Sequence, residues 1–247
     1  MKYASLRHGL VGAWCPSLGA TGYRLLDRSG YGNHGTLTNM DAGTDWVGGP
    51  YGTALDFDGV NDYVAQPLKS GSTIDHTQSV WFSTQRTTYQ YLLALEGFCS
   101  PPNTWNLIRI DITNASQVAG YVFDGSSIFI GSTTVTVNTW THAAMTRSGN
   151  VFQFYVNGRL TGSGSYTPFF ISSSPTVNDI GARRNLPTAT PFFGQIDDVR
   201  FYDRALTFAE IRLLASEPGI GLKPERTSVY FGESLSSRRR KILTGLT

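Results

Sequence analysis

The sequence is poor in charge and in cysteine, and it lacks a long apolar run. Only 15% of its 247 residues are charged, and Cys15 and Cys99 are its two cysteines. Two cysteines are too few for the disulfide framework of a small secreted domain, so we expect two free thiols, with a single bond between them as the alternative. No apolar run is long enough to cross a bilayer, which predicts no membrane insertion. No apolar stretch follows the charged residues near Met1, so we expect no secretory signal.

Glutamate is also scarce, and this bears on catalysis. Glu96 is the only glutamate before Glu210. Retaining glycoside hydrolysis requires two carboxyl groups about 5–5.5 Å apart, whereas Asp197 and Asp198 are adjacent in a predicted strand and are therefore expected on opposite sheet faces. The sequence has no Gly-x-Ser-x-Gly motif, and its four histidines lack the spacing of a triad or a metal site. It therefore predicts no catalytic residues.

Glycine and aromatic residues are plentiful. The chain has 27 glycines and 13% aromatic residues, a composition typical of short strands joined by tight turns. The alternation of apolar residues predicts strands at 10–14, 53–57, 62–65, 79–83, 91–95, 107–111, 117–123, 139–147 and 151–156. Residues 148–150 join the last two as a hairpin, and residues 58–61 join 53–57 to 62–65 as another. Short strands at this spacing predict an all-β sandwich of two antiparallel sheets.

The stretch from Phe192 to Leu214 carries the strongest local signals. Residues 192–202 read as a strand with apolar side chains on both faces, which is typical of a central strand. Strict alternation places Asp198 and Arg200 on one face and Asp197 and Val199 on the other. The Thr-x-x-Glu capping box at 207–210 then predicts the start of a short helix.

Several blocks of sequence, in a fixed order, form one pattern. They are GLVGAW at 9–14, DRSGYGNHGTLTN at 27–39, GTALDFDGVNDYV at 52–64, NTWTHAAMTRSGNVFQFYVNGRL at 138–160, NDIGARR at 178–184 and GQIDDVRFYDRALTFAEIRLL at 194–214. Together they resemble the laminin-G-like, concanavalin A-like jelly-roll family. The resemblance implies a jelly-roll sandwich over residues 1–216 with a short C-terminal helix. It does not fix an activity, because the same fold serves lectins, glycosidase appendages, adhesion modules and virion proteins.

A structural calcium ion is a further expectation, because jelly rolls of this family often hold one. Calcium prefers clustered carboxylate and carbonyl oxygens. Asp58, Asn61 and Asp62 lie in one predicted turn, and Asp197 or Asp198 could approach them from the closing strand. The alternative is that these side chains cap the turn and bond backbone amides.

Aromatic residues in loops are the candidates for contact with a glycan or a protein partner. Such residues stack on sugar rings, and they also suit protein interfaces. The sequence places a long aromatic loop between the strands at 91–95 and 107–111, whereas Trp14, Trp81 and Trp140 fall within strand patterns and are expected in the core. The candidate contact residues are Tyr89, Tyr91, Phe98, Trp105 and Tyr166.

Residues 217–247 differ in composition from the rest and are expected to form an extended basic arm. They hold six lysines and arginines against three glutamates, and they begin as a Pro/Gly-rich linker. Their anchoring residues would be Val229, Tyr230, Phe231, Arg238, Arg239, Arg240 and Lys241. The four basic residues suit nucleic-acid phosphates, an acidic protein surface or a solvated chain end.

A short helix, a linker and an Arg-rich end resemble jelly-roll proteins of tailed-bacteriophage virions. This resemblance implies a non-catalytic virion protein made in the host cytoplasm, such as a capsid decoration or tail protein. Its partners would be other capsid or tail proteins, and it would form a homo-oligomer or symmetric array. The alternative is a carbohydrate-binding lectin module for cell-surface glycans, in an extracellular location.

Overall fold

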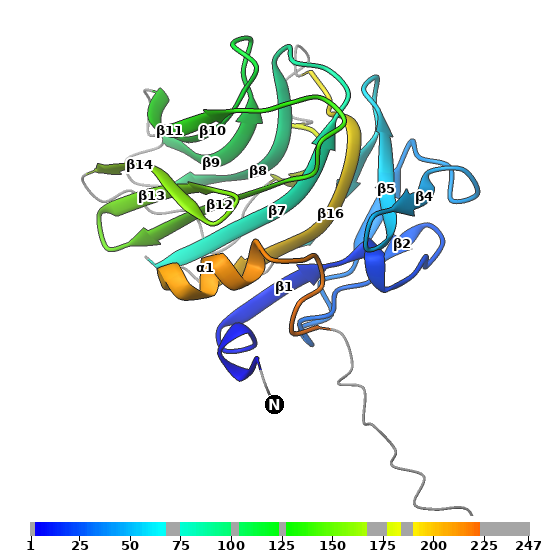
Figure 1. The fold of residues 1–247 in the computed structure, drawn as a ribbon, viewed down its shortest axis with the longest axis horizontal. Helices are drawn as coiled ribbons and strands as arrows, with labels where there is room; N and C mark the ends of the chain where they lie inside the picture. Colours follow the sequence, from blue (N-terminus) through cyan, green and yellow to red (C-terminus); the bar gives the residue numbers. More distant parts are fainter. Residues whose placement is uncertain are drawn as a thin grey trace, which may run out of the picture.

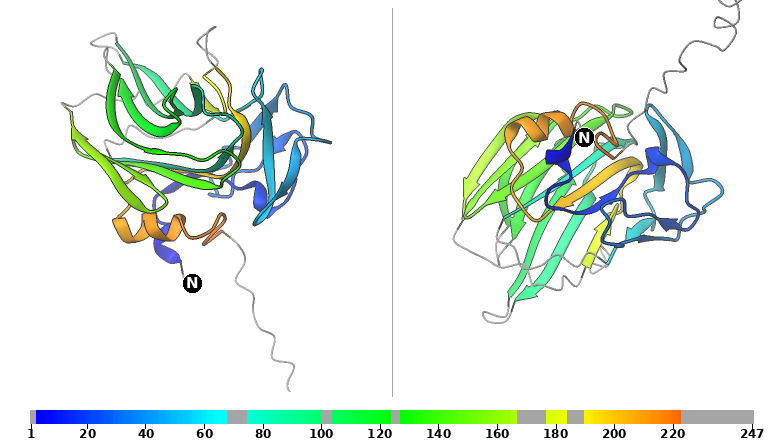
Figure 2. Two further views of the ribbon diagram at one scale, coloured as in Figure 1. Left: turned by 45° about the horizontal axis from the view of Figure 1, so that its top comes forward. Right: turned by 90° about the horizontal axis from the view of Figure 1, so that it is seen from below.

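The structure is a computed structural model, and it describes residues 3–67, 75–99, 104–123, 127–166, 177–183 and 190–222. Within these ranges the chain folds into two antiparallel sheets packed face to face, with one α-helix outside them (Figures 1 and 2). The expected all-β jelly-roll sandwich is confirmed. None of the described helices is long and apolar enough to span a membrane.

Sheet A contains the strand that closes the domain. Its order is β14-β13-β12-β7-β16-β5-β4, and β1 pairs with β16 beside this path. Its strands are β1 (Leu10–Trp14), β4 (Trp46–Gly49), β5 (Gly52–Asp58), β7 (His76–Thr84), β12 (Thr141–Ser148), β13 (Val151–Val156), β14 (Arg159–Ser165) and β16 (Phe193–Tyr202).

Sheet B packs against one face of sheet A. Its order is β11-β10-β9-β8-β15-β6-β3-β2. Its strands are β2 (Arg24–Leu25), β3 (Gly35–Thr38), β6 (Tyr63–Ala65), β8 (Gln90–Cys99), β9 (Thr104–Ile112), β10 (Gln117–Phe123), β11 (Ser127–Thr134) and β15 (Val177–Ile180).

The core between the sheets consists of inward-facing residues of both, such as Phe82, Phe154 and Ile196 from sheet A and Ile108 and Ile110 from sheet B. A second apolar cluster lies on the outer face of sheet A, the face turned away from sheet B. There the helix α1 (Phe208–Leu214) and the 3₁₀ helix η1 (Ala4–Leu6) cover the sheet (Figure 2). A second 3₁₀ helix, η2 (Pro16–Leu18), follows β1.

One predicted hairpin forms and another does not. The strands β12 and β13 pair around Ser148–Val151, as expected from their turn. The residues predicted as the 53–65 hairpin belong instead to different sheets, since β5 pairs with β4 and β16 in sheet A while β6 pairs with β3 and β15 in sheet B. The turn at 58–61 is therefore a corner between the sheets.

The helix α1 begins where the capping box predicts. Thr207 Oγ1 accepts a hydrogen bond from the Glu210 amide, and the Glu210 carboxylate accepts one from the Thr207 amide. Both oxygens of Glu210 also accept hydrogen bonds from the Arg204 guanidinium, at 2.7 and 2.9 Å. The Arg204 hydrogen bonds lower the pKa of Glu210 to about 2, so this carboxylate stays ionised at the helix N-terminus.

A β-bulge in β16 changes which residues share a face. The register to β7 shifts between Asp197 and Arg200, and Asp198 has a φ of 44°. Val199 therefore joins the core beyond the bulge, while Asp198 lies in an outer network with Asp197 and Arg200. The expected placement of Asp197 and Asp198 on opposite faces is wrong, because strict alternation cannot account for the extra residue.

Residues 217–222, expected as part of the arm, pack against the sandwich. Ile220 and Leu222 are buried in the cluster on the outer face of sheet A. The Gly219 amide donates to Asp198 Oδ2, and the Ile220 carbonyl accepts from Arg200 Nη2, each at 2.8 Å. The packed part of the chain therefore reaches at least Leu222.

Candidate functional site

The outer face of sheet B, turned away from sheet A, carries a cluster of aromatic and charged side chains that we call the sheet-B cluster. It consists of Tyr89, Tyr91, Arg109, Asp111, Tyr121 and Phe129. The register brings five of these residues together from four strands, because Tyr91 lies opposite Asp111, Tyr121 opposite Arg109, and Phe129 opposite Tyr121. In β9 the alternation places Ile108, Ile110 and Ile112 in the core, so Arg109 and Asp111 face outward.

The rings of the sheet-B cluster surround the Arg109 guanidinium. Arg109 Cζ lies 4.8 Å from the ring centroid of Tyr121 and 5.7 Å from that of Tyr91. The Tyr89 and Tyr91 rings meet edge to face at 5.2 Å, and those of Tyr121 and Phe129 meet at 5.8 Å. Cation–π and edge-to-face contacts of this kind fix the orientation of the rings.

Asp111 is the buried carboxyl group of the sheet-B cluster. Its Oδ2 accepts a hydrogen bond from the Tyr89 hydroxyl at 3.1 Å and lies 3.0 Å from Arg109 Nε. Its Oδ1 is buried and has no hydrogen-bond partner within the described part of the chain. Burial raises the pKa of Asp111 to about 7, against the opposing effect of the Arg109 charge. Asp111 therefore carries an oxygen that is free to accept a further hydrogen bond.

The rim of the sheet-B cluster is accessible. Phe129 is 54% exposed, and Tyr89, Arg109 and Tyr121 are half-buried. Aromatic rings held by a cation, with a carboxylate below them, offer both an apolar platform and hydrogen-bonding groups. This combination can hold a molecule with one apolar face and several hydroxyl groups.

The contact residues predicted from the sequence lie in different parts of the structure. Tyr89 and Tyr91 come together in the sheet-B cluster. Tyr166 lies elsewhere, against Phe152 at the edge of the core. The long loop expected around Phe98 and Trp105 is wrong, because β8 and β9 continue through these two residues and pair them directly; their side chains lie outside the described part.

The expected tryptophan core is correct for Trp14 but not for Trp140. Trp14 is fully buried between the sheets. Trp81 is buried on the outer face of sheet A, where its Nε1 donates to the Leu214 carbonyl at 3.0 Å. Trp140 is half-buried and precedes β12, so it is not a core residue.

The five expected calcium ligands do not form one group. Asp58 Oδ1 accepts hydrogen bonds from the Val60 and Asn61 amides, and Asp62 Oδ2 accepts one from the Asp58 amide. Asp58 lies opposite Phe193 in β16. Phe193 and Asp197 are four residues apart along this strand, a separation of about 13 Å, so Asp58 and Asp197 are too far apart to share one ion. No cluster of three or more His, Cys, Asp or Glu residues that could hold a metal occurs among the described residues.

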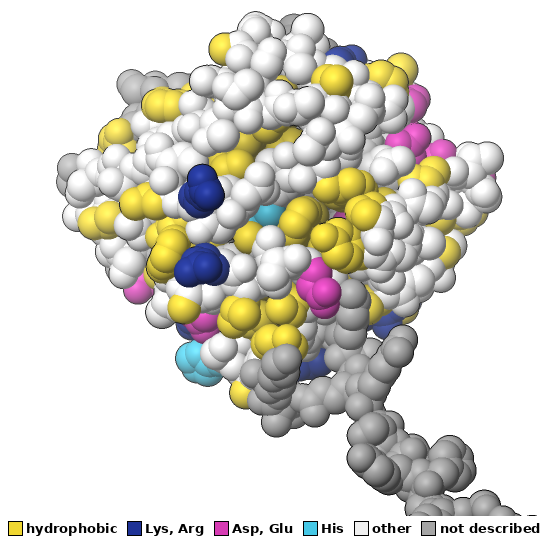
Figure 3. Space-filling view, in the orientation of Figure 1, with side chains coloured by type: hydrophobic (Ala, Val, Ile, Leu, Met, Phe, Trp, Pro, Cys, Tyr) yellow, Lys and Arg dark blue, Asp and Glu magenta, His cyan; other side chains and the backbone are white. Residues whose placement is uncertain are grey.

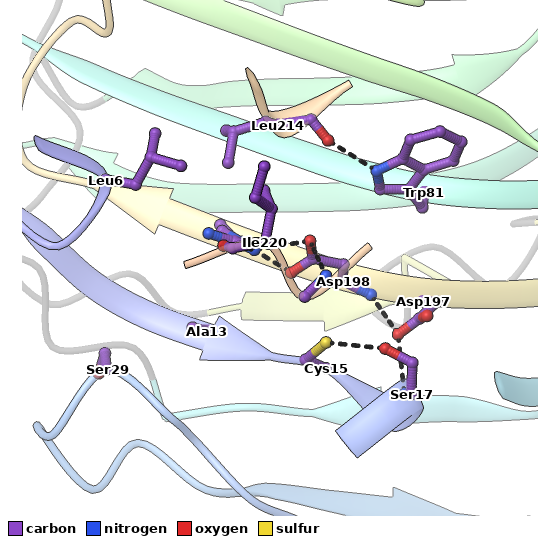
Figure 4. A network of polar contacts seen from close by, with 12 residues as sticks. Leu6, Ala13, Cys15, Ser17, Ser29, Trp81, Asp197, Asp198, Leu214 and Ile220 are labelled. Atoms are coloured by element: carbon purple, nitrogen blue, oxygen red, sulfur yellow. Dashed lines mark hydrogen bonds and ion pairs between the residues drawn. The ribbon is translucent and has the colours of Figure 1, made fainter. Parts of the chain in front are cut away.

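Asp197 and Asp198 instead belong to a buried network on the outer face of sheet A (Figure 4). Asp197 Oδ1 accepts hydrogen bonds from the amides of Ser17 and Asp198, at 3.1 and 2.7 Å. Asp198 forms a bidentate ion pair with Arg200, at 2.7 and 2.8 Å. Burial, and then the Asp198 charge, raise the pKa of Asp197 to about 6. The network joins η2, β16 and residues 219–220.

The expected anchoring residues of the arm, Val229, Tyr230, Phe231 and Arg238–Lys241, lie outside the described residues. Arg109, Asp111, Tyr121 and Phe129 were missed by the sequence reasoning. Arg109, Asp111 and Tyr121 were outward positions in the predicted strands at 107–111 and 117–123, but the sequence does not state which outward residues become neighbours across strands. Phe129 lies in β11, for which no strand was predicted.

Comparisons with solved structures show the same fold in proteins of several kinds. Domain 4 of AbnA, a GH43 extracellular arabinanase from Geobacillus stearothermophilus, in complex with arabinotriose, has a TM-score of 0.64 and 21% identity, covering 83% of this chain and 98% of that one. Trypanosoma rangeli sialidase has a TM-score of 0.63 and 18% identity over 84% of this chain, which spans only 32% of the sialidase. The receptor binding domain of botulinum neurotoxin D has a TM-score of 0.63 and 13% identity, covering 85% of this chain and 53% of that one.

The family described as the concanavalin A-like lectin/glucanases superfamily, a laminin G type, matches residues 58–212. This match covers the strands β6 to β16 and most of α1, and it includes every residue of the sheet-B cluster. The chain therefore belongs to the concanavalin A-like lectin/glucanases superfamily.

Proposed function

We propose that this protein is a non-catalytic carbohydrate-binding module and that the sheet-B cluster is its glycan site. The observation that carries the proposal is the arrangement of Tyr89, Tyr91, Tyr121 and Phe129 around the Arg109–Asp111 pair on one sheet face. Sugar rings have an apolar face that packs on aromatic rings and hydroxyl groups that bond charged side chains. Both kinds of partner are present within one cluster.

Proteins similar to this chain support the proposal that it binds carbohydrate. The family includes lectins by its description, and one solved structure of the same fold is an arabinanase domain in complex with arabinotriose. That domain is similar to this chain over nearly its whole length. Because the identity is low, we transfer neither its ligand nor its binding residues.

Each member of the cluster has a distinct part in the proposed binding. Phe129 and Tyr121 form the exposed platform, because Phe129 is the most exposed ring of the cluster and Tyr121 packs against it. Arg109 donates to a hydroxyl or a carboxylate of the ligand, and the free Oδ1 of Asp111 accepts from a hydroxyl. Tyr89 and Tyr91 hold Asp111 and Arg109 in place. We assign these last two residues a positioning role.

A glycan array followed by isothermal titration calorimetry tests the proposal. The array includes neutral arabino-, xylo-, gluco-, manno- and galacto-oligosaccharides, arabinotriose among them, and sialylated oligosaccharides. The best ligand is then titrated against wild type, Tyr121→Ala and Arg109→Ala. We expect each substitution to weaken binding by tenfold or more. Tyr31→Ala is the matched control, since Tyr31 is 67% exposed in the turn before β3.

Unchanged affinity in both Tyr121→Ala and Arg109→Ala would show that the glycan binds elsewhere and would contradict the proposed site. Failure of wild type to bind any oligosaccharide would contradict the function itself. Attachment to a virion through the arm stays a separate prediction, because it depends on residues 223–247, outside the described chain.

A further inference from the structure

The outer face of sheet A carries two adjacent rows of side chains that the sheet-B cluster does not use. In one row, Ser83 of β7 lies opposite Gln195 of β16, which lies opposite Asp56 of β5. All three point away from the core, because their chain neighbours Phe82, Ile196 and Leu55 are core residues.

The second row begins two residues further along the strands, about 6.6 Å away. It runs from His142 of β12 to Trp81 of β7 and Asp197 of β16, which are directly opposite one another. The indole of Trp81 and the imidazole of His142 are 5.5 Å apart at their centroids. Asp197 is covered by Ser17 of η2, so the first row is the more accessible one.

Aromatic rings border these rows on two sides. Tyr51, in the turn between β4 and β5, is 41% exposed and lies 6.1 Å from the Trp81 ring. Trp140, two residues before His142, reaches the same turn, because a Cβ on Gly49 would lie 3.7 Å from Trp140 Cζ2. Figure 3 views the molecule from this side: hydrophobic side chains gather over the middle of sheet A, and histidine and acidic surface shows between them.

Polar atoms in both rows lack partners. Both ring nitrogens of His142 are buried and make no hydrogen bond within the described ranges, and His142 is only 1% exposed. Asp56 Oδ1 is also without a partner there. An unsatisfied buried donor or acceptor destabilises the folded state. The folded chain therefore keeps hydrogen-bonding capacity in this place that a ligand could use.

We propose that this surface is a second glycan site, which we call the sheet-A site, and that it takes one neutral sugar unit. Tyr51 and Trp140 supply the aromatic surfaces, and the buried Trp81 ring packs beside Tyr51. Gln195 and Asp56 bond the hydroxyl groups, with His142 in the floor. The inference rests on the proposed function for its ligand class but concerns the opposite face of the sandwich.

The charges of the site select a neutral sugar over an anionic one. Its polar side chains are the Asp56 carboxylate, which accepts hydrogen bonds, and the Gln195 amide and Ser83 hydroxyl, which both donate and accept. The nearby cation Arg200 is bound by Asp198. Burial lowers the pKa of His142 to about 3, so its imidazole is neutral and offers one donor and one acceptor. Hydroxyl groups satisfy such a site, whereas a carboxylate or phosphate would meet Asp56.

The test titrates the neutral oligosaccharides named above and reads two signals. Calorimetry gives the stoichiometry, and tryptophan fluorescence reports the sheet-A site through Trp81 and Trp140. We expect two sites per chain in wild type. Tyr51→Ala and Gln195→Ala should each weaken the sheet-A site tenfold or more, and Trp140→Phe should reduce the fluorescence change, because Trp81 remains. Tyr31→Ala is again the control, and near-UV circular dichroism checks that each variant folds.

The outcomes separate this proposal from the one for sheet B. Loss of one binding event in Tyr51→Ala and of the other in Tyr121→Ala supports both sites. Loss of all binding in Tyr121→Ala, with Tyr51→Ala and Gln195→Ala unchanged, overturns the sheet-A site and leaves the sheet-B site. The reverse pattern supports the sheet-A site and overturns the sheet-B site. Absence of any neutral sugar binding in wild type overturns the sheet-A site.

Discussion

Replacing Asp198 by asparagine tests whether the buried network of Figure 4 stabilises the domain. Asp198 is the counter-ion of Arg200, whose side chain is fully buried, and its Oδ2 also accepts from the Gly219 amide. Asparagine tolerates the positive φ of 44° at this position, so the substitution removes the charge without adding backbone strain. The guanidinium of Arg200 is then left buried without its partner.

The expected cost is large. Breaking a buried ion pair by removing one partner costs about 3–5 kcal/mol, and for a domain of this size each kcal/mol lowers Tm by about 2–4 °C. Asp198→Asn should therefore lower Tm by roughly 6–20 °C. Removing the Asp198 charge also removes one of the causes that raise the pKa of Asp197, so the ionised form of Asp197 is favoured in the variant.

Thermal and urea unfolding, followed by circular dichroism, measure the effect. The matched variant is Asp198→Asn combined with Arg200→Met, which removes the stranded charge and keeps an unbranched chain of similar length. The double variant should recover at least half of the loss, since replacing both charges of a buried pair is often nearly neutral. A loss below about 1 kcal/mol in the single variant, or a double variant no more stable than the single one, would refute this reasoning.

Two further predictions concern acidic residues. Burial raises the pKa of Asp111 to about 7, so between pH 5 and 8 the folded chain binds a proton that the unfolded chain releases, and the free energy of unfolding should fall as the pH rises. Asp111→Asn should flatten this pH dependence, as measured by urea unfolding. An unchanged slope in the variant would contradict the prediction. The carboxylates of Asp58, Asp62, Asp197 and Asp198 accept hydrogen bonds from backbone amides. A chelator should therefore leave Tm unchanged. A rise in Tm of several degrees with added calcium would show instead that these residues bind the expected ion.

Local signals in the sequence predicted the elements that depend on local chemistry. The hairpin of β12 and β13 follows from its Ser-Gly-Asn turn, and α1 follows from its capping box. The corner at 58–61 has the same local appearance as a hairpin turn. Its two strands separate because their partners, β16 and β15, come from far along the chain. The residues near position 60 in the sequence do not indicate which distant strands will pair with β5 and β6.

The candidate site was predictable only in part, for the same reason. Tyr89 and Tyr91 were identified as aromatic residues near an expected loop. Arg109 and Tyr121 became their neighbours through the register of β8, β9 and β10, and β-bulges after Tyr91 and after Gly120 adjust that register. A bulge of one residue moves every later side chain to the other face. The alternation of apolar residues therefore predicts which side chains point outward, but it does not predict which of them become neighbours across strands.

The two outer faces differ in charge, and this difference should determine which glycans each face can bind. The proposed sheet-B site has a cation, Arg109, whose side chain is 12% exposed, so it should accommodate a sugar with or without a carboxylate. The proposed sheet-A site has the Asp56 carboxylate and keeps Arg200 bound to Asp198, so it should disfavour an anionic sugar. An oligosaccharide made of sialic acid units alone should thus engage sheet B and not sheet A. A neutral oligosaccharide should engage both faces, and because the faces are on opposite sides of the sandwich, one domain should then be able to bridge two neutral glycans.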